Sequence, residues 1–510
     1  MKDTFYITTP IYYPNDVPHI GHAYTTVATD FIARYRRLRG DEVFFLTGTD
    51  EHGLNLQRAA EKNGQTPKAF VDAMEPRWRE VWERLEISYT DYIRTTEARH
   101  RAAVQKLLTA VHENGRDDIY LGAYEGLYCV SCELYYPEDE LVDGNCPIHG
   151  RPVERMSEEN YFFRLSAYQD RLLEHYEQHP DSVEPDFRKN EVLSLIKGGL
   201  QDFSISRTSF DWGISLPWDP KHICYVWFDA LTNYITSAGY GSDEERFAKV
   251  WPANAHVIGK DIVRQHAVYW PAMLMAAGIE PPRKVLVHGY LLVGGEKMSK
   301  TRLTGIHPFQ LADHFGVDAY RYYFLREIRF GQDGNFSWES MLARYNAELA
   351  NGLGNLASRV LAMTDSYFDG KVPDPSSTDG GRLAAAAENL GNRFDSHMLA
   401  YELTDAVSAL DEFVREANRY LVDVAPWNLA KEPERRQDLG DALYEALEGL
   451  RVIALFAFPV MPNAAERLWT QLGIHGSLEK QRLPDAATWG RLEPGTATAR
   501  GEGLFPRLEE

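Results

Sequence analysis

The first fifty residues place a strand, a loop, a helix and a second strand in succession. Thr4–Thr9 is a short β-prone run, and the loop over residues 10–21 is rich in Pro, Asn, Asp and Gly. Residues 23–38 show helical periodicity that stops at Gly40, and an apolar strand follows over 42–47. Because two consecutive strands joined through a helix run parallel, this order predicts an α/β domain built on a parallel sheet.

The later segments extend this pattern and then replace it. A stretch rich in Tyr, Cys, Pro and Gly over 120–218 predicts an insertion between two halves of the sheet. Apolar β-like runs return at 250–258 and 284–292, with a helical stretch over 262–277 between them. From about Met341 the pattern is helical. A Pro/Gly/Ser/Asp-rich connector over 368–381 lies inside this helical region. Two apolar stripes are typical of a helix bundle, namely Leu399, Leu403, Ala406, Leu410, Phe413, Ala417 and Tyr420, and Leu439, Leu443, Leu447 and Leu450.

Composition limits the class of protein. The 510 residues contain 44% hydrophobic and 12% aromatic residues, which excludes a disordered chain. The net charge of −21 argues against a surface that binds nucleic acid everywhere, although it allows a basic face on an acidic body. Neither a secretory leader nor a membrane span is expected, since the longest apolar run, Val452–Met461, is short and contains Pro459. With only four cysteines, we expect a cytoplasmic protein.

Three of those cysteines and one histidine have the spacing of a zinc knuckle. The pattern is Cys129-x2-Cys132-x13-Cys146-x2-His149, which pairs thiolate and imidazole ligands for tetrahedral Zn²⁺. Unliganded thiols are the alternative. With four protein ligands, the predicted site is closed and structural. Cys224 stands alone and is interpreted as a buried apolar residue.

Two segments have the chemistry of phosphate binding. His19-Ile20-Gly21-His22 lies directly before a predicted helix, whose N-terminus attracts anions, and Gly21 would let a nucleotide base approach the backbone. The segment 294–301 carries Lys297 and Lys300 behind two glycines, and such lysines can move onto a polyphosphate. Taken alone, the first is more often a pair of surface histidines and the second a solvated loop. Neither segment is a P-loop.

Together, however, the two segments resemble the HIGH and KMSKS motifs of class I aminoacyl-tRNA synthetases, with Thr301 in place of the final serine. Their order, on either side of an inserted segment, is also that of the class. Further matches identify the chain as similar to methionyl-tRNA synthetases over nearly its whole length. They are Thr8–Asn15, Gly48–Gly53, Tyr225–Ala230 and His288–Tyr290.

The resemblance implies a fold and the boundaries of its domains. The fold expected is a Rossmann-like parallel-sheet catalytic domain, split by the zinc-knuckle insertion and followed by an α-helical bundle that binds the anticodon. The boundaries expected are 1–115 and 221–292 for the two catalytic halves, 116–220 for the insertion, 293–345 for the KMSKS and stem-contact region, 346–485 for the bundle and 486–510 for a C-terminal segment.

The resemblance also implies site residues. His19, His22, Lys297 and Lys300 would bind the phosphates, and Gly259 and Asp261 the adenosine. The positions that match the methionine site are Ile11, Tyr13, Asp50, Trp227, Ala230, Leu231, Tyr234 and His288, with Asp50 on the substrate ammonium. Gln265 departs from the family, whose members often carry an aromatic residue there. Asn355, Arg359 and Trp427 would read the CAU anticodon, and stacking on aromatic rings is how single-stranded RNA is commonly recognised.

The activity implied is formation of methionyl-adenylate from L-methionine and ATP with Mg²⁺, and transfer of methionine to initiator and elongator tRNA-Met by a monomer. Two alternatives stay open here: another class I synthetase, and a non-catalytic zinc-stabilised RNA-binding protein on a synthetase scaffold. The charge of −21 then predicts a narrow RNA-contact face that includes Lys297, Lys300, Arg302 and Arg359.

Overall fold

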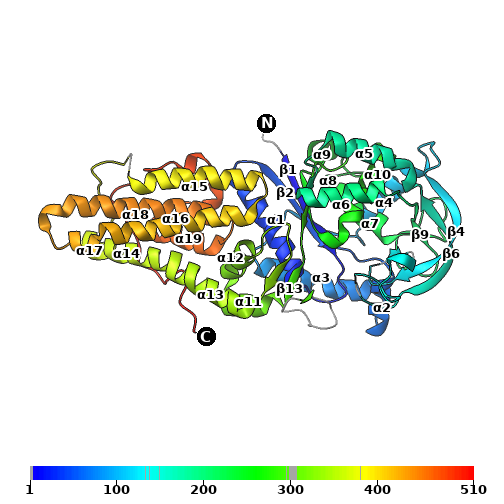
Figure 1. Ribbon diagram of the computed structural model, residues 1–510, viewed down its shortest axis with the longest axis horizontal. Coiled ribbons are helices and arrows are strands. Elements are labelled where there is room, and N and C mark those ends of the chain that lie inside the picture. The colour runs from blue at the N-terminus through cyan, green and yellow to red at the C-terminus, as the bar shows by residue number, and fades with distance from the viewer. Residues whose placement is uncertain are drawn as a thin grey trace.

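The computed structural model describes residues 4–132, 134–136, 138–148, 150–293, 296–297, 307–378 and 381–509. One half of the molecule is built around parallel strands, and the other is an elongated group of helices (Figure 1). Within the described residues, every helix is too short or too polar to cross a membrane.

A six-stranded parallel sheet forms the centre of the first half. From edge to edge its strands are β3 (Asp91–Arg94), β2 (Glu42–Thr49), β1 (Thr4–Tyr12), β11 (Ala255–Gly259), β12 (Val285–His288) and β7 (Val183–Glu184). The strand order reverses between β1 and β11, because β2 lies on one side of β1 and β12 lies beyond β11. Open parallel sheets bind ligands beside such a reversal, at the carboxyl ends of the strands.

Both faces of the sheet are buried under helices, as is usual for parallel sheets. Successive residues of β1 point to opposite faces: Phe5 and Ile7 belong to one apolar core and Tyr6 to another. The helices of this half are α1 (Ile20–Leu38), α2 (Leu54–Lys62), α3 (Pro67–Arg84), α4 (Ala98–His112), α7 (Val226–Leu231), α8 (Asn233–Ala238), α9 (Glu244–Val250) and α10 (Trp270–Ala276). Thr66 caps α3 by accepting a hydrogen bond from the Ala69 N–H (3.3 Å), and Pro67 occupies its first turn.

The predicted insertion forms an antiparallel sheet at the end of the molecule away from the bundle (Figure 1). Its strands are β5 (Leu134–Tyr136), β4 (Ile119–Cys129), β6 (Glu154–Phe163) and β8 (Phe203–Ser204), in that order. Two helices follow β6, namely α5 (Gln169–Gln178) and α6 (Asp186–Lys197), and β9 (Ser206–Arg207) pairs with β10 (Ile223–Cys224). The chain between α5 and α6 supplies β7, so the insertion also completes the edge of the main sheet.

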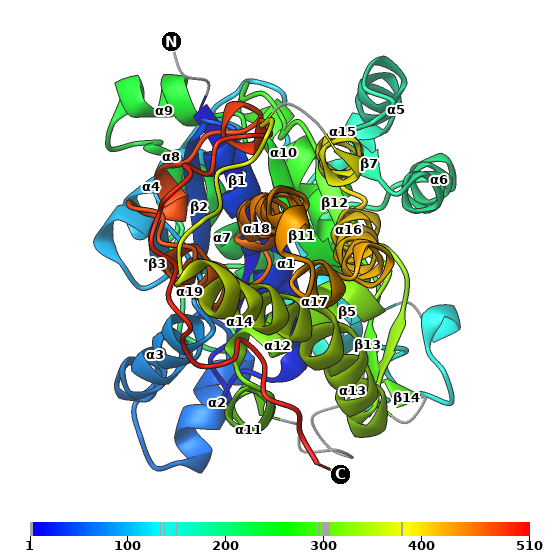
Figure 2. The ribbon, with the colours of Figure 1, turned by 90° about the vertical axis from the view of Figure 1, so that its left-hand side faces the viewer.

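The helical half begins after a small sheet of β13 (Leu291–Val293), β14 (Glu296–Lys297) and β15 (Gly334–Phe336). α11 (Pro308–Phe315) and α12 (Val317–Glu327) lie between β14 and β15 in the chain, and α13 (Trp338–Arg344) follows β15 and leads to the bundle. The bundle contains α14 (Asn355–Phe368), α15 (Arg382–Leu399), α16 (Leu403–Val424), α17 (Pro426–Leu429), α18 (Arg436–Ala457) and α19 (Pro462–Gln471). Viewed along the bundle, α18 lies among the other helices (Figure 2), which explains why it is buried on nearly every face.

The structure confirms the predicted fold class and corrects several details. β1 extends to Tyr12 and α1 begins at Ile20, so the predicted loop over 10–21 is shorter at both ends. The strand predicted over 250–258 starts only at Ala255, because Val250 ends α9 and Pro252 lacks the N–H that a central strand needs. Leu399 does not belong to the core stripe. It is 43% exposed, because it ends α15 and a turn separates it from the stripe on α16.

Candidate active site

A cavity of about 340 Å³ lies at the carboxyl ends of the strands, beside the reversal in strand order. Of the residues predicted to hold methionine or ATP, all but Lys297 and Lys300 line it. They are Ile11, Tyr13, His19, Gly21, His22, Asp50, Trp227, Ala230, Leu231, Tyr234, Gly259, Asp261 and His288. The parallel topology therefore brings segments from both halves of the sheet to one place.

The two histidines of the first phosphate motif are held by the start of α1. His19 is the N-cap residue, and its Nδ1 accepts a hydrogen bond from the Gly21 N–H (3.1 Å). The Nδ1 of His22 accepts from the His19 N–H (3.3 Å), and the two rings stack with centroids 3.7 Å apart. A neutral imidazole that accepts through Nδ1 carries its proton on Nε2. Each ring therefore has an Nε2–H donor at the positive end of a helix, the arrangement that favours an anion.

Gly21 is required for this cap. A Cβ atom at Gly21 would lie 2.9 Å from Cε1 of His19, closer than side chains tolerate. The sequence predicts that Gly21 allows a nucleotide base to approach the backbone closely, and in the structure the glycine also makes room for the His19 ring.

An aromatic wall closes one side of the cavity. The Nδ1–H of His266 donates to the Ile262 carbonyl (2.9 Å), so its Nε2 accepts from the Tyr234 hydroxyl (2.7 Å). The Tyr234 ring stacks on His256 with centroids 4.1 Å apart. Burial lowers the pKa of His266 to about 4, so this imidazole is neutral at pH 7. His266 also lines the cavity, and the sequence analysis did not assign it a role.

His288 lies beside the predicted adenosine segment. Its Nδ1–H donates to the Gly289 carbonyl (2.7 Å), and its Nε2 is 2.8 Å from the Thr25 hydroxyl on α1. Burial lowers the pKa of His288 as well. A Cβ atom at Gly259 would lie 2.6 Å from Oδ1 of Asp261 and 3.6 Å from Cε1 of His288. A glycine at 259 therefore lets the Asp261 carboxylate fold back across the backbone.

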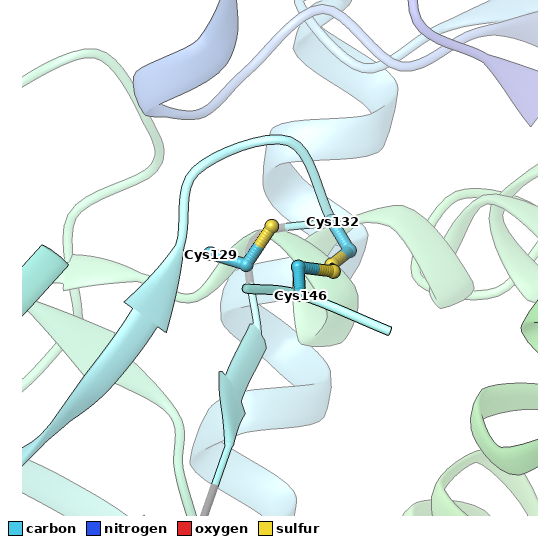
Figure 3. Close-up of side chains that lie close together, drawn as sticks. All are labelled: Cys129, Cys132 and Cys146. Carbon is cyan, nitrogen blue, oxygen red and sulfur yellow. The ribbon is translucent and has the colours of Figure 1, made fainter. Parts of the chain in front are cut away.

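Three cysteine thiols of the predicted knuckle converge (Figure 3), and one of them, Cys132, lines the cavity. Cys129, Cys132 and Cys146 are buried, and their Sγ atoms all lie within 4.8 Å of one another. Such a set of thiol donors suits a metal ion, and Zn²⁺ in particular. His149 lies outside the described residues, and Cys224 is buried apart from this cluster. The Trp227 indole donates to the Cys132 carbonyl (3.3 Å), which connects the cluster to the cavity wall.

The predicted anticodon residues lie on α14 and α17, two helices of the bundle half of the molecule, away from the parallel sheet that carries the cavity (Figure 1). Asn355 is exposed at the start of α14, and Arg359 follows one turn later. The Arg359 guanidinium lies 5.3 Å from the ring centroid of Trp427 on α17, and the tryptophan is half-buried. A stacked cation and ring at an exposed position is the chemistry of base recognition.

The second phosphate motif falls mostly outside the described residues. Lys300 and Arg302 are not described, and of Lys297 only the backbone is, within β14. That strand pairs with β13, whose first residue, Leu291, lines the cavity.

Two family models match the chain. "tRNA synthetases class I (M)" covers residues 5–157 and 148–361, and "Anticodon binding domain of methionyl tRNA ligase" covers 373–510. The chain is 49% identical to a methionine–tRNA ligase of Streptomyces coelicolor, covering 99% of this chain and 97% of the relative. It is also 49% identical to one of Caldanaerobacter subterraneus subsp. tengcongensis, covering all of this chain and 80% of the relative. Among solved structures it resembles Mycobacterium tuberculosis methionyl-tRNA synthetase in complex with methionyl-adenylate, with 45% identity, a TM-score of 0.94 and coverage of 99% and 100%.

Proposed function

Because this chain belongs to the class I methionyl-tRNA synthetases, we propose that the cavity at the carboxyl ends of its sheet holds L-methionine and ATP side by side. The enzyme forms methionyl-adenylate from these substrates and transfers methionine to the 3′-terminal adenosine of tRNA-Met. The observation that carries the site assignment is the convergence of residues from both sheet halves on one wall.

Adenylate formation needs positioning and charge stabilisation more than proton transfer. A methionine carboxylate oxygen attacks the α-phosphorus of ATP, and the bond to the β-phosphate bridging oxygen breaks to release pyrophosphate. The attacking carboxylate is already ionised at pH 7, so no general base is required. His19 and His22 donate Nε2–H groups to the phosphates at the start of α1. Lys297, Lys300 and Mg²⁺ would share the charge that develops on pyrophosphate.

Methionine is recognised between a carboxylate and an apolar wall. Asp50 binds the substrate ammonium, and Trp227 and Tyr234 contact the thioether side chain. A thioether offers no strong hydrogen bond, so shape and sulfur–aromatic contact must select it. Ile11, Tyr13, Ala230, Leu231 and His288 complete the pocket, while Gly259 and Asp261 hold the adenosine.

Pyrophosphate exchange into ATP, measured with each amino acid in turn, tests this assignment. Exchange should require methionine. Exchange without methionine, or faster exchange with cysteine, would favour another class I synthetase. Absence of any exchange would favour the non-catalytic alternative. We also propose that a monomer is active, which sedimentation at assay concentrations will test.

We propose one structural Zn²⁺ per chain, held by Cys129, Cys132, Cys146 and His149. Cys146→Ser should weaken zinc binding by more than about tenfold. Even the loss of a residue that only hydrogen-bonds to a metal ligand lowers metal affinity by about tenfold or more. The KM for methionine should rise with it, because Trp227 donates to the Cys132 carbonyl. Cys224→Ser is the matched control, since Cys224 is buried but outside the cluster. Elemental analysis that finds equal zinc in both variants would contradict the ligand set.

For the tRNA, we propose that Trp427 stacks on an anticodon base while Asn355 and Arg359 read base edges. A stacked base contributes about 1–3 kcal/mol, so Trp427→Ala should lower kcat/KM for tRNA by roughly 5- to 150-fold. Pyrophosphate exchange without tRNA should be unchanged, because the bundle end is remote from the cavity. If exchange falls in parallel, Trp427 is instead a packing residue.

We also propose the domain boundaries 1–115, 116–220, 221–292, 293–345, 346–485 and 486–510, which limited proteolysis can test.

A further inference from the structure

A buried carboxylate joins two imidazoles just behind the cavity. Oδ2 of Asp229 lies 2.7 Å from Nδ1 of His52, and its Oδ1 lies 2.6 Å from Nε2 of His100. The side chains are almost completely enclosed: Asp229 and His100 are 0% exposed and His52 is 2% exposed. None of the three lines the cavity, so none is placed to touch substrate.

The charge of Asp229 determines which atoms donate the hydrogen bonds in this group of three side chains. Burial disfavours the charged carboxylate, but His52 and His100 hold the pKa of Asp229 at about 2. The ionised carboxylate can only accept, so His52 donates through Nδ1–H and His100 through Nε2–H. Three separate segments are thereby joined: the loop after β2, helix α4 and helix α7.

Two of these segments carry the methionine site. His52 is two residues from Asp50, the carboxylate assigned to the substrate ammonium. Asp229 lies between Trp227 and Ala230, which line the cavity. The third segment, α4, contributes no residue to the cavity lining. The Asp229–His52 bond therefore connects the two ends of the amino-acid site, whereas the Asp229–His100 bond joins α7 to a helix that lies outside the site.

Other bonds hold the main chain of the loop. The Asp50 N–H donates to the Tyr12 carbonyl (2.8 Å), and the Trp212 indole donates to the Glu51 carbonyl (2.6 Å). These contacts fix the loop against β1 and Trp212. The His52–Asp229 bond joins the same loop to α7.

We infer that Asp229 is a positioning residue that, through His52, sets the distance between the ammonium-binding carboxylate and the wall that receives the methionine side chain. This inference rests on the proposed role of Asp50. This separation must match the length of the amino acid. A variant in which the separation is no longer fixed should therefore bind methionine more weakly. It should also discriminate less against homocysteine, which lacks the terminal methyl group. A displacement of about 1 Å in a site can cost as much as 10²-fold in rate.

The two histidines supply a matched pair of variants. His52→Ala should raise the KM for methionine by about tenfold, leave the KM for ATP unchanged and lower the ratio of methionine to homocysteine activation. His52→Asn should restore most of the loss, since an Asn amide nitrogen occupies the place of Nδ1. His100→Ala removes a partner from the same carboxylate, so it should lower Tm comparably but leave the KM for methionine unchanged.

Pyrophosphate exchange and thermal unfolding of all variants separate the outcomes. Equal rises in KM for His52→Ala and His100→Ala, or no rise in either, would overturn the inference and leave a purely structural role. If His52→Ala does not fold, Asp229→Asn, which keeps the side-chain shape, serves in its place with the same expectation. A wild-type enzyme that shows no methionine-dependent exchange would refute the proposed function itself, whereas normal wild-type exchange with unaffected His52 variants refutes only the inference.

Discussion

Replacing Lys300 by alanine will slow methionyl-adenylate formation by about 10²–10³-fold, the loss typical of removing one preorganised group that stabilises transition-state charge. Negative charge moves onto the leaving pyrophosphate only as the α-phosphorus is attacked, so a cation that follows it acts on the transition state and not on bound methionine. The strand within this motif, β14, lies near the cavity, because it pairs with β13, whose first residue, Leu291, lines the cavity wall.

Single-turnover formation of methionyl-adenylate measures the rate, and calorimetric titration without ATP measures methionine affinity. The rate should fall and the affinity should stay near the wild-type value. Lys249→Ala is the control, because the Lys249 ammonium pairs with Glu42 (2.9 Å) and α9 does not contribute to the cavity. Equal losses of rate and methionine affinity in Lys300→Ala would show that the lysine supports the site as a whole.

How far the sequence predicts the fold depends on the length of each element. The parallel order of β1, α1 and β2 follows from periodicity over long segments, and the structure confirms it. The edge strand β7 was not predicted, because Val183–Glu184 is too short to show alternation. It exists because the chain between α5 and α6 passes beside β12, where Val183 pairs with Val285. Tertiary position creates this strand, and local sequence does not encode it.

The candidate site divides in the same way. Residues in contiguous motifs, such as His19 and His22, could be assigned from neighbours within four positions, since a helix start arranges them locally. His266 and the group of His52, His100 and Asp229 could not. Asp229 is separated in sequence from His52 by 177 positions and from His100 by 129. Asp229 contacts the two histidines because the order of the strands brings their segments together. No spacing within a single sequence predicts such contacts.

A buried ion pair between the two halves of the molecule gives the largest expected effect on stability. Arg321 of α12 donates to Asp30 of α1 (2.6 Å), and both side chains are fully enclosed. The same guanidinium donates to the carbonyls of Leu85, Pro459 and Val460, so it joins α1 to the turn between α18 and α19. Asp30 also accepts from Arg34 (2.7 Å) and from the Ser88 N–H (2.7 Å).

Arg321→Met should lower the free energy of unfolding by about 3–5 kcal/mol, because it removes one charged partner from the buried Asp30 and the Arg321 donor from the carbonyls of Leu85, Pro459 and Val460. Arg393→Met provides the comparison. Arg393 pairs with Glu412 at the surface, where such a pair contributes about 0–1 kcal/mol. A double variant, Asp30→Leu with Arg321→Met, should recover part of the loss, since removing both charges removes the uncompensated carboxylate.

The pH dependence of this loss separates charge from packing. Burial alone would raise the pKa of Asp30, but Arg34, Arg321 and Ser88 hold that pKa well below its usual range. A carboxyl whose pKa is lowered by folding contributes stability above its unfolded pKa and loses it as pH falls through the folded one. Urea titrations should therefore show the full difference between wild type and Arg321→Met at pH 7. The difference should shrink below about pH 4, where the unfolded carboxyl binds a proton. A difference that stays constant across this range would assign the effect to the lost carbonyl hydrogen bonds and side-chain packing, with the ion pair contributing little.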